Sequence, residues 1–146
     1  MTDTTTNNYE ELIVGVLINN YEAPANFTVG LYNDSVDAIG PGDDIGAITS
    51  EPTGSSYSRQ SVDRVNCSSS QSGGNQRLEF PRVDFDTSDS DEGIDSYFLM
   101  AEFNDGTNST YRLISTGKIE SDTYSVDLSN IDQYTLSNIF IEHSES

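Results

Sequence analysis

The sequence predicts a mainly β protein: an antiparallel, jelly-roll-like β-sandwich of about seven or eight strands with one short N-terminal helix. Short runs rich in β-branched and aromatic residues alternate with segments rich in Gly, Ser, Thr, Asn and Asp, the pattern of strands joined by turns. The chain has no Trp, but its eight Tyr and six Phe can anchor a sheet. Strand signals follow one another without intervening helices, which favours antiparallel pairing over βαβ units.

The length of 146 residues is that of one ordinary domain. We expect residues 1–8 to form a flexible N-terminal end, because they are polar. Residues 9–146 are expected to form a single β-sandwich domain that includes the helix, at residues 9–20.

The helix is predicted from apolar residues spaced i, i+3, i+4, i+7 and i+8, which share one helical face. These residues are Tyr9, Leu12, Ile13, Val16 and Leu17. Asn7 or Asn8 can cap its N-terminus. The alternative is a strand, because residues 13–18 are rich in β-branched side chains.

The first strand and its connection to the second organise the chain. Residues 27–32 read as a strand, residues 33–54 as a long acidic loop, and residues 57–62 as the second strand. Residues 67–75 are Ser- and Gly-rich and are expected to be a flexible connector. The remaining strand signals are residues 77–80 (stopped by Pro81) with 83–85, 94–103, 110–115 after a turn at 104–108, 118–119, 124–128 and 136–142.

The charge excludes several classes of function. Six basic and 25 acidic residues give a net charge of −19, which repels nucleic-acid phosphates and anionic membrane surfaces. We therefore expect neither nucleic acid nor a membrane as a partner. Acids throughout with almost no lysine are typical of a halophile's protein, whose self-repulsion concentrated salt screens.

Reactive side chains are sparse. The single Cys67 cannot form an internal disulfide. His143 is the one histidine, and the chain has no Gly-x-Ser-x-Gly nucleophile motif. We therefore expect that the protein is not an enzyme and requires no cofactor.

An acidic segment is the candidate metal site. Asp84, Asp86, Asp89 and Asp91 supply carboxylate oxygens of the kind that Ca²⁺ or Mg²⁺ prefers. Their spacing is not that of an EF-hand loop. The alternative is a solvated acidic loop that binds no ion.

Two further sets of residues are candidate interfaces. Tyr57 and Arg59 would share one face of the second strand, where Arg59 could pair with an acid of a neighbouring subunit or form an internal ion pair. The helix face could dock on another protein or pack on its own sheet; its candidate interface residues are Leu12, Ile13, Val16 and Leu17.

Four motifs occur in a characteristic order between residues 9 and 81. They are Tyr9-Glu10-Glu11-Leu12-Ile13, Val29-Gly30-Leu31-Tyr32, Gly54-Ser55-Ser56-Tyr57-Ser58-Arg59-Gln60-Ser61-Val62 and Glu79-Phe80-Pro81. In the order of these motifs, the chain resembles a family of small structural proteins of tailed viruses, which are described as head decoration or tail-associated proteins. The family's Gly-Trp stretch before the long apolar strand is replaced here by the acidic residues 86–93.

The resemblance, with the acidic composition, implies a non-enzymatic virion protein of a tailed virus that infects a haloarchaeon. We expect a capsid accessory protein (decoration or vertex turret), assembled in the host cytoplasm, which forms a homo-oligomer and contacts other virion proteins. Two alternatives stay open: a neck, tail or baseplate component, and a carbohydrate- or receptor-binding β-sandwich module that contacts host surface glycans.

Overall fold

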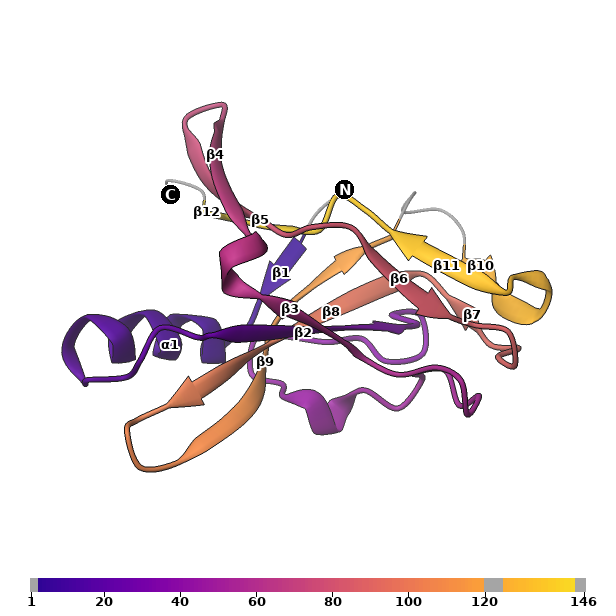
Figure 1. The fold of residues 1–146 in the computed structure, drawn as a ribbon, viewed down its shortest axis with the longest axis horizontal. Coiled ribbons are helices and arrows are strands. Elements are labelled where there is room, and N and C mark those ends of the chain that lie inside the picture. Colours follow the sequence, from indigo (N-terminus) through magenta and orange to yellow (C-terminus); the bar gives the residue numbers. More distant parts are fainter. Residues whose placement is uncertain (1–2, 120–124, 144–146) are drawn as a thin grey trace.

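The computed structural model describes residues 3–119 and 125–143. Within these residues the chain has one α-helix near its N-terminus and twelve strands in antiparallel sheets (Figure 1). The predicted class, a mainly β antiparallel sandwich with an N-terminal helix, is confirmed. The number of strands exceeds the expected seven or eight because many of them are short, with two to five residues each.

The helix α1 spans Asn7–Ile18, and three short 3₁₀ helices interrupt the loops: η1 (Ile45–Ala47), η2 (Arg64–Asn66) and η3 (Leu128–Asn130). The strands are β1 (Asp3–Thr5), β2 (Asn26–Tyr32), β3 (Gln60–Asp63), β4 (Ser68–Ser72), β5 (Asn75–Glu79), β6 (Val83–Asp86), β7 (Gly93–Ile94), β8 (Ser96–Asn104), β9 (Ser109–Lys118), β10 (Val126–Asp127), β11 (Gln133–Leu136) and β12 (Phe140–His143).

A five-stranded sheet forms the centre, with strand order β1-β9-β8-β2-β3. Its spine is the β8–β9 hairpin, whose turn at residues 104–108 was predicted and contains Gly106 at φ +90°. A β-bulge between Leu99 and Met100 interrupts the β8–β9 register. The smaller sheets pair β12-β5-β4, β11-β6 and β10-β7.

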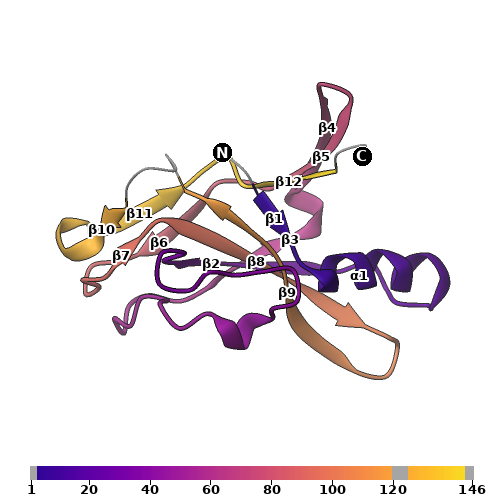
Figure 2. The same ribbon diagram turned by 180° about the vertical axis from the view of Figure 1, so that it is seen from behind.

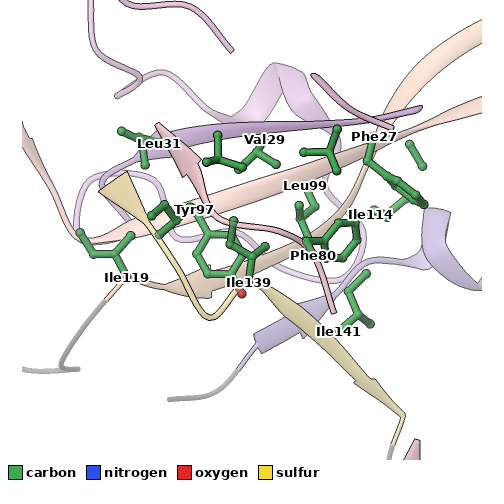
Figure 3. Packing of buried hydrophobic residues seen from close by; sticks show 14 of the residues in the cluster. Phe27, Val29, Leu31, Phe80, Tyr97, Leu99, Ile114, Ile119, Ile139 and Ile141 are labelled. Carbon is green, nitrogen blue, oxygen red and sulfur yellow. The ribbon is translucent and has the colours of Figure 1, made fainter. Parts of the chain in front are cut away.

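The main core lies between one face of the central sheet and the strands of the smaller sheets (Figures 2 and 3). Val29, Leu31 and Leu99 on the sheet are fully buried. Phe85 and Ile141 close over the core from β6 and β12, also without exposed surface.

The opposite face of the central sheet is covered by the acidic loop. Phe98 and Leu113 are fully buried there, although no second sheet lies over them. Ile39, Ile45 and Ile48 of the loop pack on them instead. The continuous apolar run of β8 follows from this arrangement, because a strand that is buried on both faces loses its alternation.

Residues 3–8 differ from the flexible N-terminal end that was expected at residues 1–8. β1 pairs with β9, and α1 begins at Asn7. The helix interpretation is confirmed over the strand alternative, but the helix ends at Ile18 rather than at residue 20, and neither Asn7 nor Asn8 is the N-cap. Thr6 holds that position without a side-chain capping bond, and its hydroxyl donates to the carbonyl of Leu113 at 2.6 Å.

Three further expectations are corrected. The supposed connector at residues 67–75 is the β4–β5 hairpin, whose two-residue turn has Gly73 and Gly74 at φ +59° and +87°. Residues 57–59 precede β3 rather than belonging to it. The strand expected at 136–142 divides into β11 and β12 around Asn138, whose φ is +58°. Tyr124, expected to begin a strand, lies outside the described residues, and β10 begins at Val126.

Candidate functional site

The acidic segment that was expected to bind Ca²⁺ or Mg²⁺ instead connects two loops by hydrogen bonds. We call this set of hydrogen bonds, from residues 53–56 to Asp89 and Glu92, the Asp89 latch. The Asp89 carboxylate accepts hydrogen bonds from the Ser55 hydroxyl at 2.7 Å and from the Ser56 backbone N–H at 3.0 Å. Glu92 accepts one from the Thr53 N–H at 2.9 Å. The hydrogen bonds from Ser55 and Ser56 lower the pKa of Asp89, so it stays ionised in this latch.

The other carboxylates of the expected metal site also have local partners. Asp84 accepts a hydrogen bond from the Thr135 hydroxyl at 2.6 Å, and Asp86 accepts one from the Ser88 hydroxyl at 2.6 Å. Asp91 is exposed. Within residues 3–119 and 125–143, no three His, Cys, Asp or Glu side chains are grouped so that they could hold a metal ion. The expected ligand set is therefore not brought together.

Asp84 and Asp86 lie on the same side of β6, because alternate residues of a strand point to the same side. With Asp132 they line an open groove of about 630 Å³. Its other lining residues are Ser56, Ser58, Gln60, Phe85, Ser88 and Gln133. Phe85 is fully buried, so the groove offers hydroxyls, amides and carboxylates but no face of this ring on which a sugar could stack.

Tyr57 and Arg59, expected at a subunit interface, form an internal cluster with Glu51. Arg59 donates from Nε and Nη2 to the two carboxylate oxygens of Glu51, both at 2.9 Å. The Tyr57 hydroxyl donates to Glu51 at 2.8 Å and accepts the backbone N–H of Leu31 at 3.0 Å. Burial raises the pKa of Tyr57 far above its usual value. The structure thus favours the internal ion pair, which fastens the end of the acidic loop to β2.

A second anchor of the acidic loop was missed in the sequence. The buried carboxylate of Asp95 accepts the Asp34 N–H at 2.7 Å and the Ser35 hydroxyl at 3.0 Å. Lys118, the one lysine of the chain, lies 3.8 Å from Asp95 and 3.3 Å from Asp34. Burial raises the pKa of Asp95, but these partners outweigh it and lower the pKa. The lone lysine was the available signal, since it is one of only six basic residues in the chain.

The predicted helix face is divided between the core and solvent. Leu12 is buried and Ile13 packs partly against the core, which confirms internal packing for these two residues. Val16 is 38% exposed and Leu17 is 74% exposed. The periodicity failed here because residues 12–18 are apolar around nearly the whole helix.

The exposed side of α1 carries an apolar surface, which we call the helix patch: Val14, Leu17 and Ile18. Their exposed fractions are 47%, 74% and 74%. The three residues are spaced i, i+3 and i+4, so they lie together on one side of the helix. The helix patch replaces the predicted docking set, of which it keeps only Leu17.

Comparison of the chain with protein-family models, curated proteins and solved structures gives no match. In the part of the chain that the structure describes, no helix has the length and apolar character needed to cross a membrane. The function is therefore inferred from the surfaces of the chain itself, above all from the helix patch.

Proposed function

We propose that the protein is a non-enzymatic structural component of the virion of a tailed virus that infects haloarchaea. It acts as a capsid accessory protein, of the decoration or vertex turret kind, and assembles as an oligomer on the particle. The observation that carries this proposal is the helix patch on an otherwise strongly acidic chain. Its function is adhesion, with α1 docking on another virion protein.

The chemistry of the helix patch suits adhesion in brine. Concentrated salt shortens the range of electrostatic attraction to about 3 Å at 1 M, so pairing of exposed charges contributes little. Burial of apolar surface does not depend on charge and contributes roughly 25 cal/mol per Å² removed from water. Leu17 and Ile18, three-quarters exposed in the isolated chain, have the most surface to bury against a partner.

The resemblance to virion proteins supports the same proposal. Its first motif lies in α1, its second in β2, and its third runs from the Asp89 latch into β3. The loop between the second and third motifs is fastened at both ends, by Asp95 and by Glu51. A particle component benefits from such rigidity, because an ordered surface loses less conformational entropy when it docks.

Purified virions provide the test. Mass spectrometry of the particles should detect the chain, and cryo-microscopy should place α1 against a capsid protein. A position at the neck, tail or baseplate would favour that alternative over a capsid accessory protein. Absence of the chain from washed virions would overturn the proposed function.

A variant tests the role of the helix patch in the particle. Leu17→Asp with Ile18→Asp, supplied during infection, should lower incorporation at least tenfold relative to the wild-type chain. The matched control is Val36→Asp with Thr107→Asp, which adds the same charge at two exposed residues outside α1 and outside residues 64–78. Equal loss in both variants would show that added charge alone, and not the helix patch, controls incorporation.

A further inference from the structure

The β4–β5 hairpin ends the three-stranded sheet with an open strand edge. β4 pairs with β5 along its whole length, from Ser68 opposite Glu79 to Ser72 opposite Asn75. No strand of the described residues pairs with its other edge. The hairpin projects away from the body of the protein in both views (Figures 1 and 2). Backbone N–H and C=O groups on the outer edge of β4 are therefore available to another strand.

The hairpin lies almost entirely within the longest acid-free stretch of this acidic protein, and its one acid is Glu79 at the end of β5. Acids make up 25 of the 146 residues, yet residues 64–78 contain none and include two arginines. The other outer strands of the two larger sheets, β1, β3 and β12, contain Asp3, Asp63 and Glu142 respectively.

Proteins usually protect open edges with charges, prolines or bulges. β4 has the sequence Ser-Ser-Ser-Gln-Ser and an unbroken register with β5. Since none of these protections is present, the outer edge of β4 is suited to pair with another strand.

The edge is held in a fixed position by its neighbours. Leu78 of β5 packs against the core, and Ile141 of β12 is fully buried in it. Arg77 lies 3.2 Å from the Glu142 carboxylate and stacks over Phe140 at 4.0 Å from the ring centroid. The tight turn at Gly73 and Gly74 fixes the tip. Such an edge is ordered before it meets a partner, which lowers the entropic cost of pairing.

We propose that β4 pairs antiparallel with β4 of a second copy of this chain around a two-fold axis. The product is a continuous sheet with strand order β12-β5-β4-β4-β5-β12. A two-fold axis makes one surface self-complementary, and centring it on Ser70 gives the longest overlap of the two five-residue strands. This inference specifies the oligomer of the proposed function, but it concerns the chain alone and needs no particle.

A second copy can approach along β4, because this strand adds no acids to the contact. Two bodies that each carry a charge of −19 repel one another, so copies associate best through segments that lack acids and project from the body. β4 meets both conditions. Its short serine side chains also leave room for a neighbouring strand at the usual spacing of about 4.8 Å.

Sedimentation equilibrium of the purified chain over a range of KCl concentrations tests the pairing. The wild-type chain should form dimers that strengthen as salt is added. Ser69→Asp with Gln71→Asp should weaken the dimer at least tenfold, because residue 69 then faces residue 71 of the other copy and like charges oppose one another. Thr107→Asp with Asn108→Asp, on the exposed β8–β9 turn, is the matched control and should dimerise as the wild type does.

Disulfide cross-linking provides a second measurement. In a Cys67→Ser background, Ser70→Cys should give a covalent dimer on mild oxidation, because the axis places residue 70 opposite itself. Thr107→Cys in the same background should stay monomeric. Equal cross-linking at both positions would overturn the two-fold register.

The pairing is overturned by a wild-type chain that is monomeric at every salt concentration, or by a Ser69→Asp/Gln71→Asp variant that dimerises normally. Equal dissociation of the Thr107→Asp/Asn108→Asp control would overturn it too. Thermal unfolding of each variant establishes that the fold is retained. These outcomes are separate from the virion test: a monomeric chain found in virions overturns only the pairing, and a dimeric chain absent from virions overturns only the proposed function.

Discussion

Arg59 and Glu51 form a two-point ion pair, with both nitrogen–oxygen distances at 2.9 Å. The Glu51 side chain is 19% exposed and the Arg59 side chain 40%, so solvent screens the pair only in part. The same carboxylate accepts the Tyr57 hydroxyl, and the Arg59 guanidinium lies 5.4 Å from the centre of the Phe98 ring. One acid therefore joins the end of the loop to both faces of the central sheet.

Glu51→Ala should destabilise the fold by about 1–2 kcal/mol, because it leaves the Tyr57 hydroxyl and Arg59 without their acceptor. Chemical denaturation measures the change. Glu11→Ala is the control: its partner Arg112 is 3.0 Å away, but the Glu11 side chain is half exposed, so the loss should stay below about 0.5 kcal/mol. Equal losses in the two variants would contradict the role of Glu51 as an anchor.

The sequence was sufficient to predict the class of fold, because the periodicity of short apolar runs is a local property. The helix near the N-terminus and the hairpin around residues 104–108 followed from local spacing and turn residues. The β4–β5 hairpin did not, since Ser-rich strands carry no apolar alternation and the Gly73-Gly74 turn was interpreted as flexibility.

Site predictions failed where the partner is distant in sequence. Asp89 is separated from Ser55 by 34 residues, and no pattern around Asp89 reveals that the carboxylate is already occupied. The helix face failed for a different reason: in a helix that is apolar on most sides, tertiary packing alone decides which side is buried. Leu12 and Leu17 therefore have opposite environments although both fit the predicted periodicity.

Gly30→Ala should destabilise the protein by about 2–3 kcal/mol. The ring of Phe98 lies across Gly30, and a Cβ added there would overlap the ring. Thermal unfolding tests this against Gly42→Ala, where a Cβ meets nothing within 4 Å and stability should change little. The double variant Gly30→Ala/Phe98→Leu should recover part of the stability that Gly30→Ala loses. A neutral Gly30→Ala would show that the ring can move aside.

Asp37 should make part of the stability depend on pH. Burial raises its pKa, but hydrogen bonds from Ser50 and Thr49 outweigh it and lower the pKa to about 2. A carboxyl with a lowered folded-state pKa contributes stability above its unfolded value of about 3.9, and this contribution is lost as the pH falls towards 2. Asp37→Asn should cost about 1 kcal/mol at neutral pH, with allowance for solvent screening, and the difference from wild type should vanish in acid.

An NMR titration of the Asp37 carboxyl checks the cause directly. In the wild type the carboxyl should titrate near pH 2, and in Ser50→Ala it should move towards its ordinary value, because one hydroxyl donor is removed. A wild-type value near 3.9 would contradict the hydrogen-bonded arrangement. Concentrated KCl should be present throughout, so that protonation of other acids does not add stability by relieving repulsion.

The net charge of −19 should make folding itself depend on salt. Like charges are closer together in the folded chain than in the unfolded one, so their repulsion opposes compaction until salt screens it. The unfolding temperature should rise steeply from low salt to about 1 M KCl, where the screening length has fallen to about 3 Å, and each 1 kcal/mol gained should add roughly 2–4 °C. Glu10→Gln with Asp91→Asn, two exposed acids, should reduce this slope, because the variant carries less like charge to screen. An unfolding temperature that is independent of KCl would show that self-repulsion does not limit the stability of the fold at low salt.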